Sequence, residues 1–412
     1  MIIEKSTLEG NCFAPPSKSM AHRYLIAASF CSKKITVKNI SYSQDILATL
    51  DCLKAMGKDY ILEKDSVTFT GLNNEINDSQ IVFNCKESGS TLRFFIPIAL
   101  LLKNDAKFLG SQTLLHRPLS VYEDICNKQN ILLNIGEASI TKSGMLKPGI
   151  FEIDGNISSQ FITGLLFALP LLEKDSVIKI KHKFESRSYV EMTLMVLAEF
   201  GIMTKWLNKK TLLIKANQKY HTAQDSVSVE GDFSNAAFLD VFNTCGSNVK
   251  VEGLNMQSLQ GDKIYFDYYK ALCKKKPRLN ISNCPDLGPV LFVVASLHNG
   301  AIFTGTKRLK IKESDRGQVM KEELSKFGVF MKVYKNKIVI NKSEVTKPMQ
   351  EIYCHNDHRI VMAMVTMLCF TGGIVKGVSA VKKSFPDYFI KLKKLGLQFT
   401  TENDEEQKLM EE

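Results

Sequence analysis

The sequence predicts an α/β protein of two domains, each built from three β-α-β-α-β-β repeats. Three observations lead to this prediction. Six segments share one form, in which polar residues able to cap a helix precede a mostly apolar helix. Each is followed 26 to 31 residues later by an amphipathic helix, and short runs of β-branched residues lie between the helices. Repetition of one supersecondary unit along the whole chain is the mark of a repeat architecture.

The first helix of each repeat is apolar on nearly every side, which predicts burial at the centre of a domain. Polar residues that favour helix caps stand at its start. The six starts are Ser17, Ser88, Ser158, Ser234, Asp286 and Asp357.

The second helix of each repeat is amphipathic, so we expect it to cover the outside of its domain. Four of these helices are followed by a glycine, which suits the left-handed residue that often ends a helix. The starts lie near Ser43, Leu119, Ser188, Asp262, Ser314 and Phe385, and the glycines are Gly57, Gly201, Gly328 and Gly396.

Runs of β-branched residues between the helices predict strands. Examples are KITVKNI, SVIKIKH, NVKVEGL and KIVINK. Three repeats form each domain, and the boundary between the two sets falls near residues 227–229, ahead of EGDFSNAAF.

Composition is that of an ordinary globular protein, with 44% hydrophobic and 24% charged residues in a chain of 412. Its ten cysteines include no CxxC pair, which argues against a zinc site and a disulfide framework and predicts reduced thiols in the cytoplasm. The N-terminus lacks the pattern of a secretory signal. The longest apolar runs are shorter than the roughly 18 to 20 residues of a bilayer span.

Cations gather at the predicted helix starts, where the helix dipole is already positive. Two cations about 6 Å apart repel by roughly 3 kcal/mol at an effective dielectric near 20. A ligand with several anionic groups would offset this repulsion, and arginine suits bidentate binding of phosphate and carboxylate. The cations are Lys18, Arg23, Arg93, Arg117, Lys312, Arg316, Arg359 and Lys383.

Two carboxylates stand among these cations. Asp286 is a candidate base for a substrate hydroxyl, and Glu313 could donate or accept a second proton. Each has a structural alternative: Asp286 could cap its helix, and Glu313 could pair with Arg316 three residues on. The sequence also lacks a GxxxxGK[ST] motif, which argues against a P-loop kinase.

A series of motifs along essentially the whole chain resembles the 5-enolpyruvylshikimate-3-phosphate (EPSP) synthase family. They stand in the family's order: PSKSMAHR, ESGSTLR, HRP, SSQ, ESRSY, VEGDFSNAA, PDLGP, IKESDR, NDHR and KKSFPDYF. The resemblance implies two inside-out α/β barrels, or prisms, of three βαβαββ units each. It also implies that the first strand joins the C-terminal domain. The expected domains are therefore 13–228, and 1–12 with 229–412.

The resemblance implies transfer of the enolpyruvyl group of phosphoenolpyruvate to shikimate 3-phosphate, with release of phosphate. Asp286 would deprotonate the 5-hydroxyl, and Glu313 with Lys18 would protonate the methylene group. Domain closure would assemble the site and exclude water. No metal and no organic cofactor are implied. We expect a cytoplasmic monomer that binds neither nucleic acid nor membrane.

The resemblance also implies the binding residues of each substrate. For shikimate 3-phosphate they are Lys18, Ser19, Arg23, Ser158, Ser159, Gln160, Ser186, Tyr189, Asp286, Arg308 and Lys312. For phosphoenolpyruvate they are Lys18, Gly89, Arg93, Arg117, Gln160, Arg316, Arg359 and Lys383.

Three positions bear on single contacts. Glu87 stands where the family often has asparagine, and a carboxylate there would repel a bound phosphate unless it turns away. Arg308 stands where some members have an asparagine that contacts the shikimate. Gly89 is retained where alanine marks members that resist glyphosate, which predicts a glyphosate-sensitive enzyme.

Two other functions remain open. A sister enzyme that transfers enolpyruvyl to a UDP-sugar has a similar fold but usually carries a cysteine before the matching Arg-Pro, and GSQTLLHRP has none. A basic nucleic-acid-binding protein would explain the net charge of +11. It would not explain Asp286 and Glu313 within the cation set.

Overall fold

The computed structural model describes residues 1–76 and 79–410, and the chain forms two units. The N-terminal unit is Lys18–Glu230, and the C-terminal unit combines Met1–Ser17 with Gly231–Glu412. We propose that these units are the two domains that the sequence predicts, with bounds a few residues from the expected ones.

The N-terminal unit contains three four-stranded sheets with one common topology. In each sheet a parallel pair is extended by two antiparallel strands, in the orders β14-β3-β5-β4, β6-β7-β9-β8 and β10-β11-β13-β12. The strands are β3 (Ile35–Lys38), β4 (Lys58–Leu62), β5 (Ser66–Asn73), β6 (Gln80–Asn84), β7 (Asp105–Leu109), β8 (Leu132–Ile135), β9 (Ile140–Ser143), β10 (Ile150–Asp154), β11 (Ser176–Lys181), β12 (Thr204–Asn208), β13 (Thr211–Ile214) and β14 (Ser226–Ser228).

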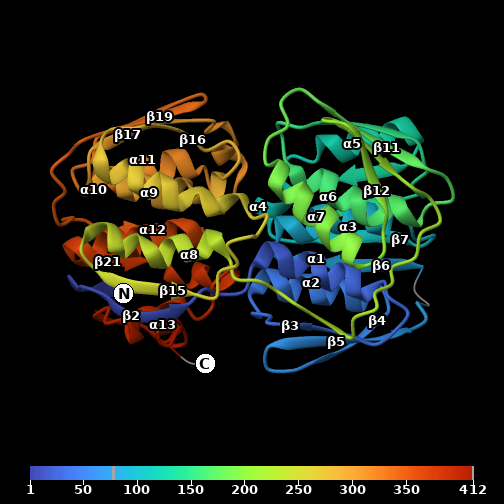
Figure 1. The fold of residues 1–412 in the computed structure, drawn as a ribbon, viewed down its shortest axis with the longest axis horizontal. Helices are drawn as coiled ribbons and strands as arrows, with labels where there is room; N and C mark the ends of the chain where they lie inside the picture. Colours follow the sequence, from blue (N-terminus) through green and yellow to red (C-terminus); the bar gives the residue numbers. More distant parts are fainter. Residues whose placement is uncertain (77–78, 411–412) are drawn as a thin grey trace. The chain divides into compact units, whose positions relative to one another are not determined.

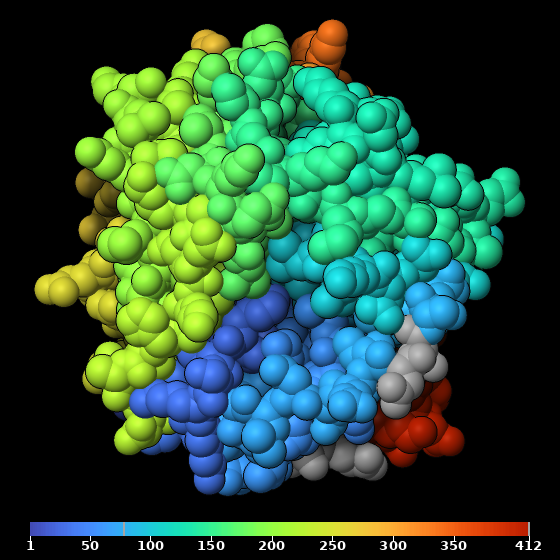
Figure 2. Space-filling view, turned by 90° about the vertical axis from the view of Figure 1, so that its right-hand side faces the viewer, coloured from blue at the N-terminus to red at the C-terminus, as the bar shows by residue number. Residues whose placement is uncertain are grey.

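The first helix of each repeat packs at the centre of this unit, as predicted. In Figure 1, α1, α3 and α6 lie side by side within the sheets, and nearly all their residues are buried. In Figure 2, segments of all three repeats, coloured blue to yellow-green, make up most of the visible surface. The helices are α1 (Lys18–Ser29), α2 (Gln44–Ala55), α3 (Gly89–Ala99), α4 (Gln112–Leu115), α5 (Ser120–Gln129), α6 (Ser159–Ala168) and α7 (Arg187–Glu199).

The C-terminal unit repeats this topology in the sheets β16-β17-β19-β18 and β20-β21-β1-β22, while β2 and β15 form a parallel pair. The first two strands of the chain thus pair within this unit. The strands are β1 (Ile2–Ile3), β2 (Glu9–Phe13), β15 (Asn248–Glu252), β16 (Arg278–Asn280), β17 (Gly300–Thr304), β18 (Met331–Tyr334), β19 (Lys337–Asn341), β20 (Ile352–Tyr353), β21 (Gly373–Lys376) and β22 (Phe399–Thr400).

Three apolar helices, α8, α10 and α12, form the core of the C-terminal unit (Figure 1). Together with the N-terminal unit they complete six repeating α/β units, which confirms the predicted fold class. The helices are α8 (Phe233–Asp240), α9 (Tyr265–Lys274), α10 (Gly288–Leu297), α11 (Arg316–Ser325), α12 (His358–Thr371), α13 (Tyr388–Lys394) and α14 (Asp404–Gln407).

Local details differ from the sequence prediction at a few helix starts. The helix expected at Asp286 begins at Gly288, after a 3-10 turn over Pro285–Leu287. Pro289 explains the shift, because proline is favoured in the first turn of a helix. The short helix α4 was not predicted. The four predicted terminal glycines all have positive φ, between 72° and 104°.

Candidate active site

The first helices of the N-terminal unit present uncompensated positive ends. None of α1, α3 and α6 has an acidic residue in its first turn. Ser88 caps α3 by accepting from the Thr91 amide, and Ser158 caps α6 by accepting from the Gln160 amide. The remaining N–H groups at such helix starts form a site that favours an anion.

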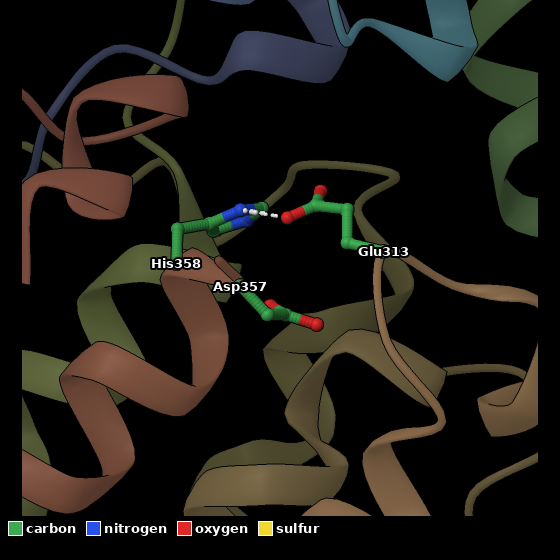
Figure 3. Close-up of side chains that lie close together, drawn as sticks. All are labelled: Glu313, Asp357 and His358. Carbon is green, nitrogen blue, oxygen red and sulfur yellow. Dashed lines mark hydrogen bonds and ion pairs between the residues drawn. The ribbon is translucent and has the colours of Figure 1, made fainter. Parts of the chain in front are cut away.

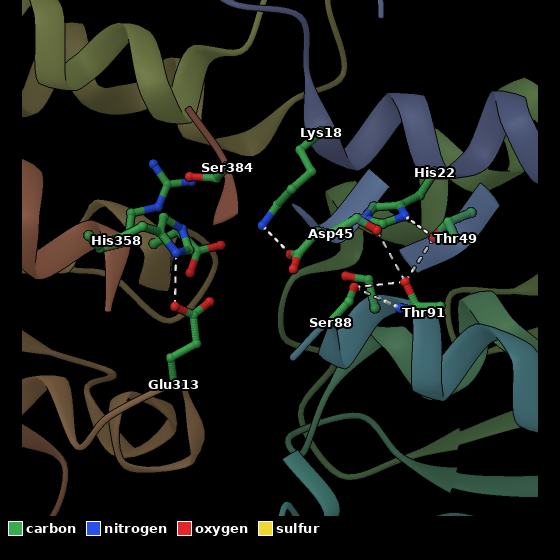
Figure 4. Close-up of polar contacts among 12 residues, drawn as sticks. Lys18, His22, Asp45, Thr49, Ser88, Thr91, Glu313, His358 and Ser384 are labelled. Carbon is green, nitrogen blue, oxygen red and sulfur yellow. Dashed lines mark hydrogen bonds and ion pairs between the residues drawn. The ribbon is translucent and has the colours of Figure 1, made fainter. Parts of the chain in front are cut away.

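Lys18 is the first residue of α1 and forms an ion pair with Asp45 of α2. Its Nζ lies 2.6 Å from Oδ2 of Asp45, and both side chains are largely buried (Figure 4). Asp45 was not predicted as a site residue, because its partner lies 27 residues away in the sequence.

Gly89 is surrounded by two guanidinium groups. A Cβ at this position would lie 2.7 Å from Nη1 of Arg117 and 3.1 Å from Nη1 of Arg93. Within the described residues, the buried Nε of Arg117 has no hydrogen-bond partner. Two close cations at a helix start repel each other, so this arrangement fits a bound phosphate.

Gln160 connects Arg93 to the cap region of α3. Its Oε1 accepts from Nη1 of Arg93 at 2.8 Å, and its Nε2 donates to Oγ of Ser90 at 2.9 Å. The guanidinium of Arg93 also lies over the ring of Phe161. These contacts hold Arg93 and Gln160 in one orientation across α3 and α6.

Arg23 is buried on α1 and is largely committed to internal partners. It donates to the carbonyl oxygens of Ser19 and Tyr189 and to the hydroxyls of Thr163 and Thr193. Burial lowers the pKa of Arg23 to about 10, so the group stays charged at neutral pH. If Arg23 binds the shikimate carboxylate as predicted, it would therefore do so through N–H groups that these partners do not use.

The serines predicted to bind the sugar phosphate lie at the starts of α6 and α7. Ser159 and Ser186 are buried, whereas Ser158 and Tyr189 are half-buried. Ser186 precedes α7 in the left-handed region with φ 54°, unusual for a residue with a side chain. Functional sites often hold such strained backbone, which agrees with a binding role for this turn.

A chain of buried polar side chains lies below the starts of α1, α2 and α3. His22 Nδ1, Thr49 Oγ1, Thr91 Oγ1 and Ser88 Oγ are joined in this order by hydrogen bonds of 2.8 Å each (Figure 4). Burial, and then the charges of Lys18 and Arg23, hold the pKa of His22 well below its usual value. No sequence signal revealed this chain, although His22 and Thr49 follow Lys18 and Asp45 by one helical turn.

In the C-terminal unit, Asp286 shares one carboxylate oxygen between two cations. Its Oδ1 lies 2.9 Å from Nζ of Lys312 and 2.7 Å from Nη1 of Arg316. Burial alone would raise the pKa of Asp286, but Lys312, Arg316 and Arg359 hold it well below the usual range. Asp286 does not cap α10, which has no side-chain cap.

Arg316 is anchored from its other side by Asp357, which caps α12. Oδ2 of Asp357 accepts from Nε of Arg316 at 2.8 Å and from Ser314 at 3.0 Å. Oδ1 accepts from Nη2 of Arg316 at 3.1 Å and from the Arg359 amide at 2.9 Å. Arg316 is thus fixed with Nη1 directed to Asp286.

Glu313 pairs with His358, and its carboxylate lies near that of Asp357 (Figure 3). Oε2 of Glu313 lies 2.8 Å from Nδ1 of His358. These three side chains could in principle hold a metal ion, since their ligand atoms lie within 4.8 Å of one another. However, both oxygens of Asp357 already accept two hydrogen bonds each, which a metal would have to displace.

Arg359 and Lys383, both predicted phosphoenolpyruvate ligands, are buried in the C-terminal unit. Nη1 of Arg359 donates to Oδ1 of Asn235 at 2.8 Å, and Nζ of Lys383 donates to the carbonyl of Asn356 at 2.6 Å. Asn356 has φ 53° and immediately precedes Asp357. This strained turn connects Lys383 to the start of α12.

Arg308 and Glu87, the two positions that depart from the family pattern, lie in different units. Arg308 is buried and donates to the carbonyl of Ser282 at 3.4 Å. Glu87 is half-buried in the turn before α3.

The predicted site residues fall into two sets, one in each unit. The N-terminal set is Lys18, Ser19, Arg23, Gly89, Arg93, Arg117, Ser158, Ser159, Gln160, Ser186 and Tyr189. The C-terminal set is Asp286, Arg308, Lys312, Glu313, Arg316, Arg359 and Lys383. Asp45, Asp357 and the polar chain of His22 were missed.

Comparison with known proteins identifies relatives over nearly the whole chain. The family model described as EPSP synthase (3-phosphoshikimate 1-carboxyvinyltransferase) matches residues 2–392. The 3-phosphoshikimate 1-carboxyvinyltransferase of Clostridium perfringens (strain 13 / Type A) is 39% identical, over 96% of this chain and 98% of that protein. The one of Clostridioides difficile (strain 630) is 37% identical, over 96% and 97%.

Solved structures share the fold at lower identity. An EPSP synthase from Acinetobacter baumannii superposes with a TM-score of 0.76 at 20% identity, covering 96% of this chain and 98% of that one. The enolpyruvyl transferase NikO from Streptomyces tendae gives a TM-score of 0.76 at 11% identity, covering 96% and 97%.

Proposed function

The chain belongs to the EPSP synthase (3-phosphoshikimate 1-carboxyvinyltransferase) family, and we propose that the two sets of residues at its helix starts carry out the family's reaction. The protein is a transferase of the shikimate pathway. It moves the enolpyruvyl group of phosphoenolpyruvate to the 5-hydroxyl of shikimate 3-phosphate and releases phosphate.

Residues of both units are assigned to phosphoenolpyruvate. The cations around Gly89 receive its phosphate, since Nη1 of Arg93 and Nη1 of Arg117 both lie within 3.1 Å of the place where a Cβ of this residue would stand. Further positive charge comes from Nη1 of Arg316 and from the side chains of Arg359 and Lys383. This charge stabilises the phosphate as it leaves. Lys18 contacts both substrates.

Shikimate 3-phosphate is assigned mainly to the starts of α6 and α7. Ser158, Ser159 and Ser186 bind its phosphate with Lys312, while Gln160 and Tyr189 line this half of the site. Ser19 and Arg23 hold the carboxylate. Arg308, buried beside Lys312, is assigned to the same substrate.

The chemistry needs one base and one acid. Asp286 takes the proton of the 5-hydroxyl, whose oxygen attacks carbon 2 of phosphoenolpyruvate. Glu313, together with Lys18, protonates carbon 3, which gives a tetrahedral intermediate. Removal of a proton from the new methyl group and loss of phosphate then restore the double bond.

The partners and place of action follow from this assignment. We propose that the protein acts in the cytoplasm as a monomer on small anionic substrates. Among the described residues no helix is long and apolar enough to cross a membrane.

The shared contact of Asp286 with Lys312 and Arg316 is the observation that carries the residue roles, because it brings the candidate base to cations assigned to each substrate. The test is phosphate release by the purified protein with both substrates together and with each alone. We expect release only with both. Asp286→Ala and Lys18→Met should both reduce it strongly with the fold intact, and full activity in either variant would remove that residue from the mechanism.

A further inference from the structure

The two cations that touch Asp286 share a single oxygen of it. Lys312 Nζ and Arg316 Nη1 both lie within 2.9 Å of Oδ1. The Asp286 and Lys312 side chains keep about a quarter of their surface exposed (24% and 25%), whereas Arg316 keeps 2%. The Asp286 and Lys312 side chains are therefore partly accessible to solvent, whereas the Arg316 side chain is not.

In this arrangement Asp286 is a poor base. Burial works to raise its pKa, but Lys312, Arg316 and Arg359 together hold the pKa well below the usual range. The strongest charged influences on Asp286 are cationic: Lys312 precedes α11, Arg316 starts α11, and Arg359 lies in the first turn of α12. Acidic groups are also close, since Asp357 and Glu313 act on Arg316 and Asp262 acts on Cys284 beside Asp286. The nearby Cys284 thiol is itself held neutral, since burial raises its pKa. General-base catalysis is most efficient when the pKa of the base lies near the operating pH.

The two cations that contact Oδ1 of Asp286 are assigned to different substrates. Under the proposed function, Lys312 binds shikimate 3-phosphate and Arg316 binds phosphoenolpyruvate. Asp357 holds Nε and Nη2 of Arg316 in place, whereas Nη1 donates to Asp286. A substrate anion could replace Asp286 as the acceptor of Nη1. An anion at either cation competes with Asp286 for the same donors.

We propose that Lys312 and Arg316 mask Asp286 in the free enzyme by binding its carboxylate. Asp286 becomes a competent base only when shikimate 3-phosphate has bound Lys312 and phosphoenolpyruvate has bound Arg316 in its place. This rests on the proposed function, which assigns the two cations to two substrates. Either substrate alone leaves one cation on Oδ1, so the base is not released until the acceptor hydroxyl and the enolpyruvyl donor are both present.

The proposal predicts that removing the charge of Asp286 strengthens binding while it destroys turnover. In the variants Asp286→Asn and Asp286→Ala, Nη1 of Arg316 no longer has a carboxylate competitor. Phosphoenolpyruvate alone should then bind about tenfold more tightly than it binds the unaltered enzyme, which corresponds to about 1.4 kcal/mol. Phosphoenolpyruvate is the cleaner probe, because shikimate 3-phosphate would also lose its own contact with Asp286.

The measurement is titration calorimetry of phosphoenolpyruvate into each purified protein, with turnover and thermal unfolding recorded in parallel. Asp267→Asn is the matched control: it removes one exposed carboxylate on α9 of the same unit. Its affinity should stay within about twofold of the unaltered enzyme, well below a tenfold effect. The double variant Asp286→Asn/Arg316→Met should lose the gain, because the released donor is gone.

The outcomes separate the two proposals. Lost turnover with tighter binding of phosphoenolpyruvate supports the masked base. Lost turnover with unchanged or weaker binding in both Asp286 variants overturns the masking and leaves the catalytic role standing. Full turnover in Asp286→Asn overturns both, since the residue is then not the base.

Discussion

Asp357 accepts two hydrogen bonds from Arg316, from Nε to Oδ2 at 2.8 Å and from Nη2 to Oδ1 at 3.1 Å. Both side chains are at most 2% exposed. The same carboxylate caps α12 through the amide of Arg359. One residue therefore sets the position of two cations assigned to phosphoenolpyruvate.

Asp357→Asn should impair the use of phosphoenolpyruvate more than that of shikimate 3-phosphate. The amide has one acceptor oxygen and would direct an N–H group at the guanidinium, so Arg316 shifts. A displacement of about 1 Å can cost roughly 100-fold in rate, and we expect a loss of this order in kcat/KM for phosphoenolpyruvate. Steady-state kinetics with each substrate varied in turn measures the split.

Asp315→Asn is the control for this variant. Asp315 caps α11 by accepting from the amide of Gln318, as Asp357 caps α12, whereas the Arg316 guanidinium donates to Asp357. Its kinetics should stay close to those of the unaltered enzyme. Equal losses for both substrates in Asp357→Asn, with a lowered melting temperature, would indicate a structural role alone.

Lys18→Met should lower turnover by at least about 100-fold, since general acid catalysis and charge stabilisation contribute factors of this size. The methionine keeps the length of the side chain but loses the contact with Asp45 and the charge near both substrates. Lys33→Met is the control, because Lys33 forms an exposed ion pair with Asp225 and follows the end of α1 opposite to Lys18. Normal kcat in Lys18→Met would remove this lysine from the chemistry.

The fold was predictable because its signals are local. Apolar helices such as α3, β-branched runs such as β11 and terminal glycines such as Gly57 each follow from neighbouring residues, and the sixfold repetition reinforced them. The comparisons confirm the family and the reaction that the motifs implied. The exact start of α10 was missed because Pro285 and Pro289 shift the helix by two residues.

The contacts within the site were not predictable from the sequence. Asp357 lies 41 residues from Arg316, and Thr49 lies 42 residues from Thr91. No local pattern couples side chains at such separations, since the coupling depends on how the helices pack. Asp286 and Glu313 were selected for their charge. Their partners, Lys312 with Arg316 and His358 respectively, appeared only in the structure.

Gly89→Ala should raise the KM for phosphoenolpyruvate and weaken inhibition by glyphosate, which should inhibit the unaltered enzyme strongly. The added methyl group would meet Nη1 of Arg117 at 2.7 Å and Nη1 of Arg93 at 3.1 Å, so both guanidinium groups must move. We expect a rise in KM of about tenfold, equivalent to about 1.4 kcal/mol of binding. Initial rates with phosphoenolpyruvate varied at fixed glyphosate concentrations give both constants.

Gly136→Ala provides the comparison, because its Cβ would meet only a backbone oxygen of Ser139 at 3.2 Å, in the turn after β8. Its kinetics should not change. Normal turnover of the unaltered enzyme in a large excess of glyphosate would contradict the expected sensitivity.

His22 should make the stability of the protein depend on pH below about 6.5. Burial holds the folded-state pKa of His22 well below the unfolded value of 6.5. Between these two values the unfolded chain binds a proton that the folded protein does not. The free energy of unfolding therefore falls as pH drops below 6.5, by up to about 1.4 kcal/mol per pH unit from this group.

The measurement is urea unfolding between pH 5 and 8 of the unaltered protein and of His22→Gln. The difference between their slopes isolates His22 from other groups, such as His298, whose pKa burial also lowers. His22→Gln should be less stable at pH 8 but should show the shallower slope below pH 6.5. Thr49→Val keeps the imidazole while it removes the hydroxyl partner, so the steep slope should remain. Equal slopes in the unaltered protein and His22→Gln would mean that the imidazole can be protonated in the folded state, and the neutral hydrogen-bonded chain from His22 to Ser88 would then be wrong.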